Sequence, residues 1–172
     1  HHTSRLTFAF LPMTQSKMHA DEVHTDAALV RALLAAQFPQ WATLPIAAVP
    51  SSGTDNALYR LGDDRVVRLP RIHWAVGQVA KEQQWLPRLA SHVPLAIPEP
   101  LALGEPGLGY PWQWSVYRWL DGDAISPAHP VDLARAVGDL ANFVTALQRI
   151  DATDGPPPGA HNSHRGEPLT AR

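Results

Sequence analysis

Residues 57–69, ALYRLGDDRVVRL, carry the clearest structural signal in this chain. Two runs rich in β-forming residues, 57–61 and 65–69, are joined by Gly-Asp-Asp, a composition typical of the turn in a β-hairpin. The apolar run Ile-Ala-Ala-Val at 46–49 comes just before and is separated from the hairpin by the flexible segment 50–54, Pro-Ser-Ser-Gly-Thr. We therefore expect three antiparallel strands in a row.

Three helices are expected around these strands. The first covers residues 25–38, and the second covers 74–92 with a kink or a break into two helices at Pro87. The third covers 130–150, where apolar residues recur at spacings of four and three and predict one buried stripe. The members of that stripe are Leu133, Val137, Leu140, Val144 and Leu147.

Two further strands, 101–104 and 112–120, would complete a five-stranded, mostly antiparallel sheet. A sheet flanked by helices and followed by a separate helical region is an α+β fold. We expect residues 1–17 to be tag or upstream sequence, 18–120 to form the lobe that contains the sheet, and 121–172 to begin a second, helical lobe.

The composition excludes several classes of protein. The chain has 172 residues, a formal net charge of −2 and no cysteine. The charge argues against nucleic-acid binding, and the lack of cysteine excludes disulfides, thiolate metal sites and a cysteine nucleophile. No run approaches the roughly 18 apolar residues of a membrane span, and no export signal is evident, so we expect a cytoplasmic protein without a membrane partner.

Four stretches, in this order along the chain, resemble the amino-terminal lobe of the aminoglycoside phosphotransferase family, which has a protein-kinase-like fold. They are SGTDNALYRL at 52–61, VVRLP at 66–70, KEQQWLPRL at 81–89, and WSVYRWLDG at 114–122. The resemblance covers about residues 23–150. It implies a kinase-like lobe that binds ATP or GTP with Mg²⁺, in an enzyme that phosphorylates a hydroxyl of an aminoglycoside or related compound.

The resemblance places the nucleotide phosphates at the turn Ser51, Ser52, Gly53 and Thr54, with Asn56 beside it. Small residues let backbone N–H groups approach anionic oxygens, and hydroxyls add donors, so the composition suits this role. An ordinary hairpin turn explains the same residues and remains the alternative.

Arg68 stands where the kinase pattern usually has a Lys that grips the phosphates, and the resemblance pairs it with Glu82 on the following helix. Tyr117, Trp119 and Leu120 would belong to the hinge, whose backbone binds the edge of the base. The alternative for Arg68 and Glu82 is that they are solvated surface charges without mutual contact. The alternative for Tyr117 to Leu120 is an ordinary core strand that ends at a turn.

The second half of the family's machinery is absent from this sequence. Residues 138–142, Gly-Asp-Leu-Ala-Asn, look like its His-Gly-Asp catalytic loop, but Val137 replaces the His and Asp139 lies within a strong helical pattern. We interpret Asp139 as an exposed helix carboxylate. We therefore expect the chain to be a truncated, amino-terminal part of such a kinase, with the Mg²⁺ ligands in the missing remainder of the second lobe, and to be catalytically inert by itself.

Two alternatives stay open at this point. The chain could be a short, non-catalytic module that binds a nucleotide or a protein, including a homodimer formed through an apolar surface around Trp119 and residues 133–147. It could also be part of a kinase of the same fold that acts on a sugar, an amino acid or a macrolide, because the second lobe selects the hydroxyl acceptor.

Overall fold

A computed structural model describes residues 21–50, 53, 55–122, 132–159, 162 and 165–167. The chain divides into two compact units: His1–Pro87 with Pro98–Asp121, and Arg88–Ile97 with Gly122–Arg172. The described elements follow the predicted order of helix, three strands, helix, two strands and helix.

All five strands form one sheet in the order β1-β2-β3-β5-β4, and every pairing is antiparallel. The predicted five-stranded α+β fold is therefore confirmed. The last strand is shorter at both ends than the predicted 112–120, since it covers only Trp114–Arg118. The strands are β1 (Ile46–Ala48), β2 (Asn56–Leu61), β3 (Arg65–Pro70), β4 (Pro100–Gly104) and β5 (Trp114–Arg118).

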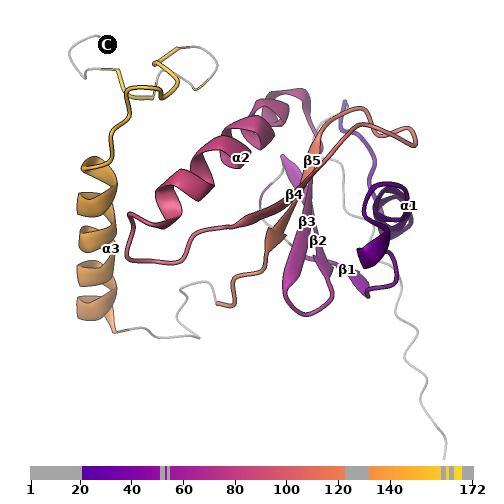
Figure 1. Ribbon diagram of the computed structural model, residues 1–172, viewed down its shortest axis with the longest axis horizontal. Coiled ribbons are helices and arrows are strands. Elements are labelled where there is room, and N and C mark those ends of the chain that lie inside the picture. The colour runs from indigo at the N-terminus through magenta and orange to yellow at the C-terminus, as the bar shows by residue number, and fades with distance from the viewer. Residues whose placement is uncertain are drawn as a thin grey trace, which may run out of the picture. The chain divides into compact units, whose positions relative to one another are not determined.

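Helix α1 (Ala27–Gln37) covers one face of the sheet and forms the apolar core with it (Figure 1). Asp26 caps the helix by accepting a hydrogen bond from the Leu29 N–H at 2.7 Å. Residues in β2 alternate between partly exposed and buried, as a strand with one face on a core requires. The buried core consists of Val30, Leu33, Leu34, Ala57, Tyr59, Leu61, Val67, Leu69, Tyr110, Trp114 and Val116.

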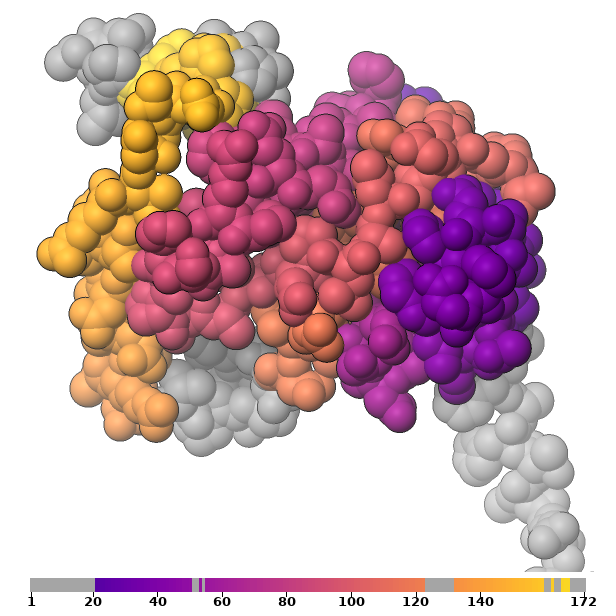
Figure 2. Space-filling model, viewed as in Figure 1, coloured from indigo at the N-terminus to yellow at the C-terminus, as the bar shows by residue number. Residues whose placement is uncertain are grey.

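A side-chain amide attaches helix α1 to the connection between β4 and β5. The Gln37 side chain donates to the Glu105 carbonyl at 2.9 Å and accepts from the Glu105 N–H at 2.7 Å. In the space-filling view, helix α1 in indigo lies directly beside this connection (Figure 2). The helix is thus fixed at its C-terminal end as well as through its apolar face.

Helix α2 (Val76–Ala90) faces the opposite side of the sheet (Figure 1). A short 3₁₀ turn, His73–Ala75, leads into it. The helix is continuous through Pro87, so of the two predicted outcomes, a kink or a break into two helices, the break does not occur. Pro87 has no N–H to donate within the helix, and only three helical residues follow it.

Helix α3 (Leu133–Gln148) belongs to the second unit and is capped by Asp132, which accepts from the Arg135 N–H at 3.1 Å. Asp139 is exposed and pairs with Arg135 at 3.7 Å, as expected for a helix carboxylate. The stripe is not buried: the five side chains from Leu133 to Leu147 are 40% to 69% exposed, which agrees with the alternative expectation of an apolar surface around residues 133–147. Periodicity identifies an apolar face, whereas burial also needs a partner for that face.

Within the described ranges, no helix combines the length and the apolar character needed to cross a membrane.

Candidate functional site

The first unit contains a cavity of about 300 Å³ between the sheet face and helix α2. Strands β2, β3 and β5, the helix, and the segments before β4 and after β5 all contribute to its wall. The lining residues are Leu58, Val66, Arg68, Glu82, Leu86, Pro98, Tyr117, Arg118, Trp119 and Leu120.

Strand register explains which side chains reach the cavity. Leu58 pairs with Arg68, and Val66 pairs with Tyr117, so these four side chains share the sheet face opposite the α1 core. Leu86 from α2 adds an apolar wall. The result is a mainly apolar slot with a few convergent polar groups, the usual composition of a small-molecule site.

The polar groups meet at one carboxylate oxygen. Arg68 Nη1 donates to Glu82 Oε2, and the Tyr117 hydroxyl donates to the same oxygen at 2.5 Å. The Arg68 and Glu82 side chains are 23% and 25% exposed, so the ion pair is partly shielded from solvent. Burial, followed by the hydrogen bond to Glu82, raises the pKa of Tyr117 to about 12. Tyr117 is therefore neutral, and a donor, at physiological pH.

Helix α2 is tied to the sheet one residue beyond Glu82. Gln83 Nε2 donates to Ser115 Oγ at 3.0 Å and to the Ala102 carbonyl at 3.3 Å. These bonds link the helix to β5 and β4 independently of the ion pair. The two hydrogen bonds of Gln83 therefore hold the Glu82 backbone near the sheet even without the ion pair of the Glu82 carboxylate.

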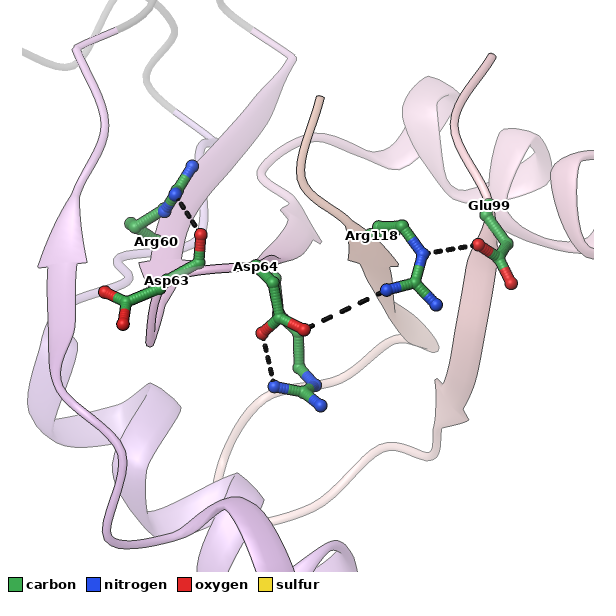
Figure 3. Close-up of polar contacts among 6 residues, drawn as sticks. Arg60, Asp63, Asp64, Glu99 and Arg118 are labelled. Carbon is green, nitrogen blue, oxygen red and sulfur yellow. Dashed lines mark hydrogen bonds and ion pairs between the residues drawn. The ribbon is translucent and has the colours of Figure 1, made fainter. Parts of the chain in front are cut away.

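The segment after β5 is held from both sides. Its backbone N–H groups at Arg118 and Trp119 donate at 2.9 Å to the carbonyls of Glu99 and Asp64, respectively. The Arg118 guanidinium also reaches the carboxylates of Glu99, at 2.6 Å, and Asp64, at 3.9 Å (Figure 3). This end of the cavity is thus built before any ligand arrives.

The Trp119 ring is held by strand β2. The Arg60 guanidinium lies 4.1 Å from the ring centroid, a cation–π geometry. The same guanidinium donates to the Asp63 carbonyl (Figure 3). The indole N–H donates to Asp121 at 2.8 Å. The β2–β3 turn and the end of β2 therefore support the cavity wall at Trp119.

Five of the ten residues singled out from the sequence line this cavity, namely Arg68, Glu82, Tyr117, Trp119 and Leu120. Asn56 begins β2 opposite Pro70 and does not line the cavity. Its buried Oδ1 has no hydrogen-bond partner among the described residues. Gly53 is described but lies outside the lining, and Ser51, Ser52 and Thr54 fall outside the described residues.

Sequence reasoning missed the apolar walls and the residues that hold the segment after β5. The alternation in β2 could have identified Leu58, since its neighbours Ala57 and Tyr59 are the core-facing positions. Asp64, Glu99 and Arg118 left no comparable signal, because they meet only through strand pairing.

No group of three or more His, Asp or Glu side chains gathers as a metal site within the described part of the chain. The Mg²⁺ requirement stays a prediction.

A model of the phosphotransferase enzyme family matches residues 46–171 of this chain. A comparison with curated proteins gives no match. The family match covers both the cavity residues from Leu58 to Leu120 and helix α3.

Several solved structures share the fold. The GDP complex of wild-type aminoglycoside 2'-phosphotransferase-IIIa has a TM-score of 0.69 and 22% identity, over 80% of this chain and 48% of that chain. The GDP and kanamycin complex of APH(2")-IIia has a TM-score of 0.66 and 23% identity, over 76% of this chain and 46% of that chain. The streptomycin–ATP complex of APH(2")-IIa has a TM-score of 0.50 and 18% identity, over 76% of this chain and 43% of that chain. The chain thus spans less than half the length of each.

Proposed function

The chain belongs to the phosphotransferase enzyme family, and we propose that its cavity is the nucleotide site of an ATP- or GTP-dependent small-molecule kinase. The acceptor would be a hydroxyl of an aminoglycoside or a related compound. The shared kinase-like fold supports this proposal, as do GDP and ATP in the solved structures that resemble the chain. The chain itself would supply the part that holds the nucleotide.

The observation that carries the proposal is the placement of Arg68. Glu82 holds this guanidinium at the cavity, and the contacts of Arg68 within the described residues engage only Nη1. Arginine has five N–H donors in a planar fork that matches two oxygens of a phosphate. Arg68 therefore keeps donors for a phosphate while the ion pair fixes its direction.

The rest of the cavity suits a base. Leu58, Val66 and Leu86 present apolar side chains that can pack against the faces of a flat ring. Because the N–H groups of Arg118 and Trp119 are already engaged, a backbone N–H that donates to the base edge would have to come from Leu120 or a later residue.

The assigned residues bind and orient the nucleotide, which is the main protein contribution in phosphoryl transfer. None of them is placed to accept the proton of an acceptor hydroxyl. We therefore expect this 172-residue chain to bind a nucleoside triphosphate without transferring its γ-phosphate. Substantial phosphotransfer by the purified chain would contradict this expectation.

The test is a calorimetric titration of the chain with ATP and with GTP. Arg68→Ala removes a charge-assisted phosphate contact, which contributes about 1.5–3 kcal/mol, so affinity should fall about 10- to 100-fold. Arg135→Ala is the matched control, since Arg135 is a highly exposed arginine of α3. If Arg68→Ala binds ATP and GTP as tightly as the wild type, Arg68 does not bind the phosphates. If the wild-type chain binds neither nucleotide, the cavity is not a nucleotide site.

One observation favours a second function as an interaction module. The exposed apolar stripe of α3 is a surface that proteins normally cover. Homodimerisation through this stripe stays a prediction, and it is compatible with the nucleotide site.

A further inference from the structure

We propose that Tyr117 is a positioning residue: its hydroxyl holds Glu82 so that Arg68 is aimed at the nucleotide phosphates. The inference rests on the proposed nucleotide site and assigns a new role within it. Tyr117 would act through two other side chains.

Strand geometry brings the three groups together. Arg68 in β3 pairs with Ser115 in β5, and Tyr117 lies two residues further along the same strand. Residues two apart point to the same face of a sheet, so Arg68 and Tyr117 both face helix α2. They approach Glu82 from two different strands and meet at its Oε2 atom.

The ion pair holds Arg68 and Glu82 together but leaves the Glu82 carboxylate some rotational freedom. A partly exposed pair gains little from its Coulomb attraction, and holding two long side chains in one geometry costs conformational entropy. Both partners are about a quarter exposed. A second, stiffer partner is therefore needed to hold the carboxylate in one orientation.

Tyr117 has the properties of such a partner. The residue is only 3% exposed, and its aromatic side chain has two torsions where Glu82 has three. Its hydroxyl is a neutral donor over the physiological range, and a hydrogen bond to a charged acceptor is stronger than one between neutral groups. The hydroxyl thus restrains the position of Glu82 Oε2, and the hydrogen bond from Arg68 Nη1 to that oxygen orients the Arg68 guanidinium.

The same geometry separates positioning from folding. Gln83 binds Ser115 and the Ala102 carbonyl, so helix α2 stays attached to the sheet without the Tyr117 hydroxyl. Tyr117→Phe keeps the buried ring and removes only the hydrogen bond. The carboxylate of Glu82 then gains rotamers, and Arg68 follows it away from the phosphates.

The experiment measures the affinity of the 172-residue chain for GTP and ATP, and separately for guanosine and adenosine. Tyr117→Phe should weaken triphosphate binding roughly fivefold, which corresponds to about 1 kcal/mol, and leave nucleoside binding unchanged. Tyr59→Phe is the matched control, because this sheet tyrosine donates to Thr25 on the opposite face, at 3.1 Å. The control should bind every ligand like the wild type.

A double-mutant cycle tests the route of action. If Tyr117 acts through Arg68, Tyr117→Phe should have no further effect on triphosphate binding in the Arg68→Ala background. Equal losses for nucleoside and triphosphate, an additive effect in the cycle, or failure of Tyr117→Phe to fold would each overturn the positioning role. Absence of nucleotide binding by the wild type, or an Arg68→Ala variant with full affinity, would instead remove the proposed function on which the role depends.

Discussion

Gly104 and Trp114 are packed against each other at the end of the β4–β5 pairing. A Cβ atom added at Gly104 would lie 2.1 Å from Cε2 of the indole. Trp114 cannot easily move away, because it is fully buried, donates to the Glu105 carbonyl at 3.1 Å and meets the Phe38 ring edge-on at 5.5 Å. Glycine at this position is therefore a packing requirement.

We predict that Gly104→Ala destabilises the first unit by about 1–3 kcal/mol or more, the cost of inserting a methyl group into a packed core. Thermal and urea unfolding measure the effect. Gly77→Ala is the control, because a Cβ there meets nothing within 4 Å and alanine is favoured over glycine in a helix. Equal stability of the two variants would contradict the packing argument.

At the scale of elements, a buried ion pair joins the segment before α1 to the end of β3. Glu22 and Arg71 are paired with side chains 1% and 11% exposed. Backbone bonds reinforce the contact: the Val23 N–H donates to the Arg71 carbonyl at 2.9 Å, and the Arg71 N–H donates to the Asp55 carbonyl at 2.7 Å. Arg71 thus connects the chain before α1, the end of β3 and the start of β2.

We predict that Glu22→Ala lowers the free energy of unfolding by about 3–5 kcal/mol, because it leaves the Arg71 charge buried without this carboxylate. Asp139→Ala removes half of an exposed pair on α3 and should cost at most about 0.5 kcal/mol. Chemical denaturation of the two variants compares these costs. A small, equal loss in both would show that the Glu22 pair is no stronger than a surface pair.

At the scale of the whole molecule, the first unit is discontinuous in sequence, yet it contains every residue that lines the cavity. The core residues from Val30 to Val116 also belong to it. The second unit contains helix α3, with its exposed stripe. The proposed nucleotide site and the apolar stripe therefore belong to different units of the same chain.

We predict that a truncated chain ending at Asp121 folds cooperatively and binds ATP or GTP with the affinity of the 172-residue chain. Circular dichroism and the same calorimetric titration test this. Introducing Arg68→Ala into the truncated chain should abolish most of the affinity, as it should in the longer one. A truncated chain that folds but no longer binds nucleotide would show that the second unit contributes to the site.

Local patterns predicted most of the fold. The hairpin at 57–69, the capped apolar face of α1 and the order of elements all depend on residues close together in sequence. Strand and helix periods and turn residues encode such features directly. Local patterns left two outcomes open, a kink or a break at Pro87 and a buried or an exposed stripe on α3, because each depends on what surrounds the helix.

The candidate site was predictable only in part. Arg68, Glu82 and the segment from Tyr117 to Leu120 were identified through a family resemblance, and the structure places them on one cavity. The hydrogen bond from the Tyr117 hydroxyl to Glu82, and the bonds from Arg118 and Trp119 to Asp64 and Glu99, were not predicted from the sequence. These contacts join residues that are distant along the chain.

The strands, the helices and the residue types available for binding could be predicted from the sequence alone, because they follow from local periodicity and side-chain chemistry. That Arg68 and Tyr117 share one oxygen of Glu82 became evident only from the folded chain. Strand register depends on the whole fold, and it determines which side chains distant in sequence meet.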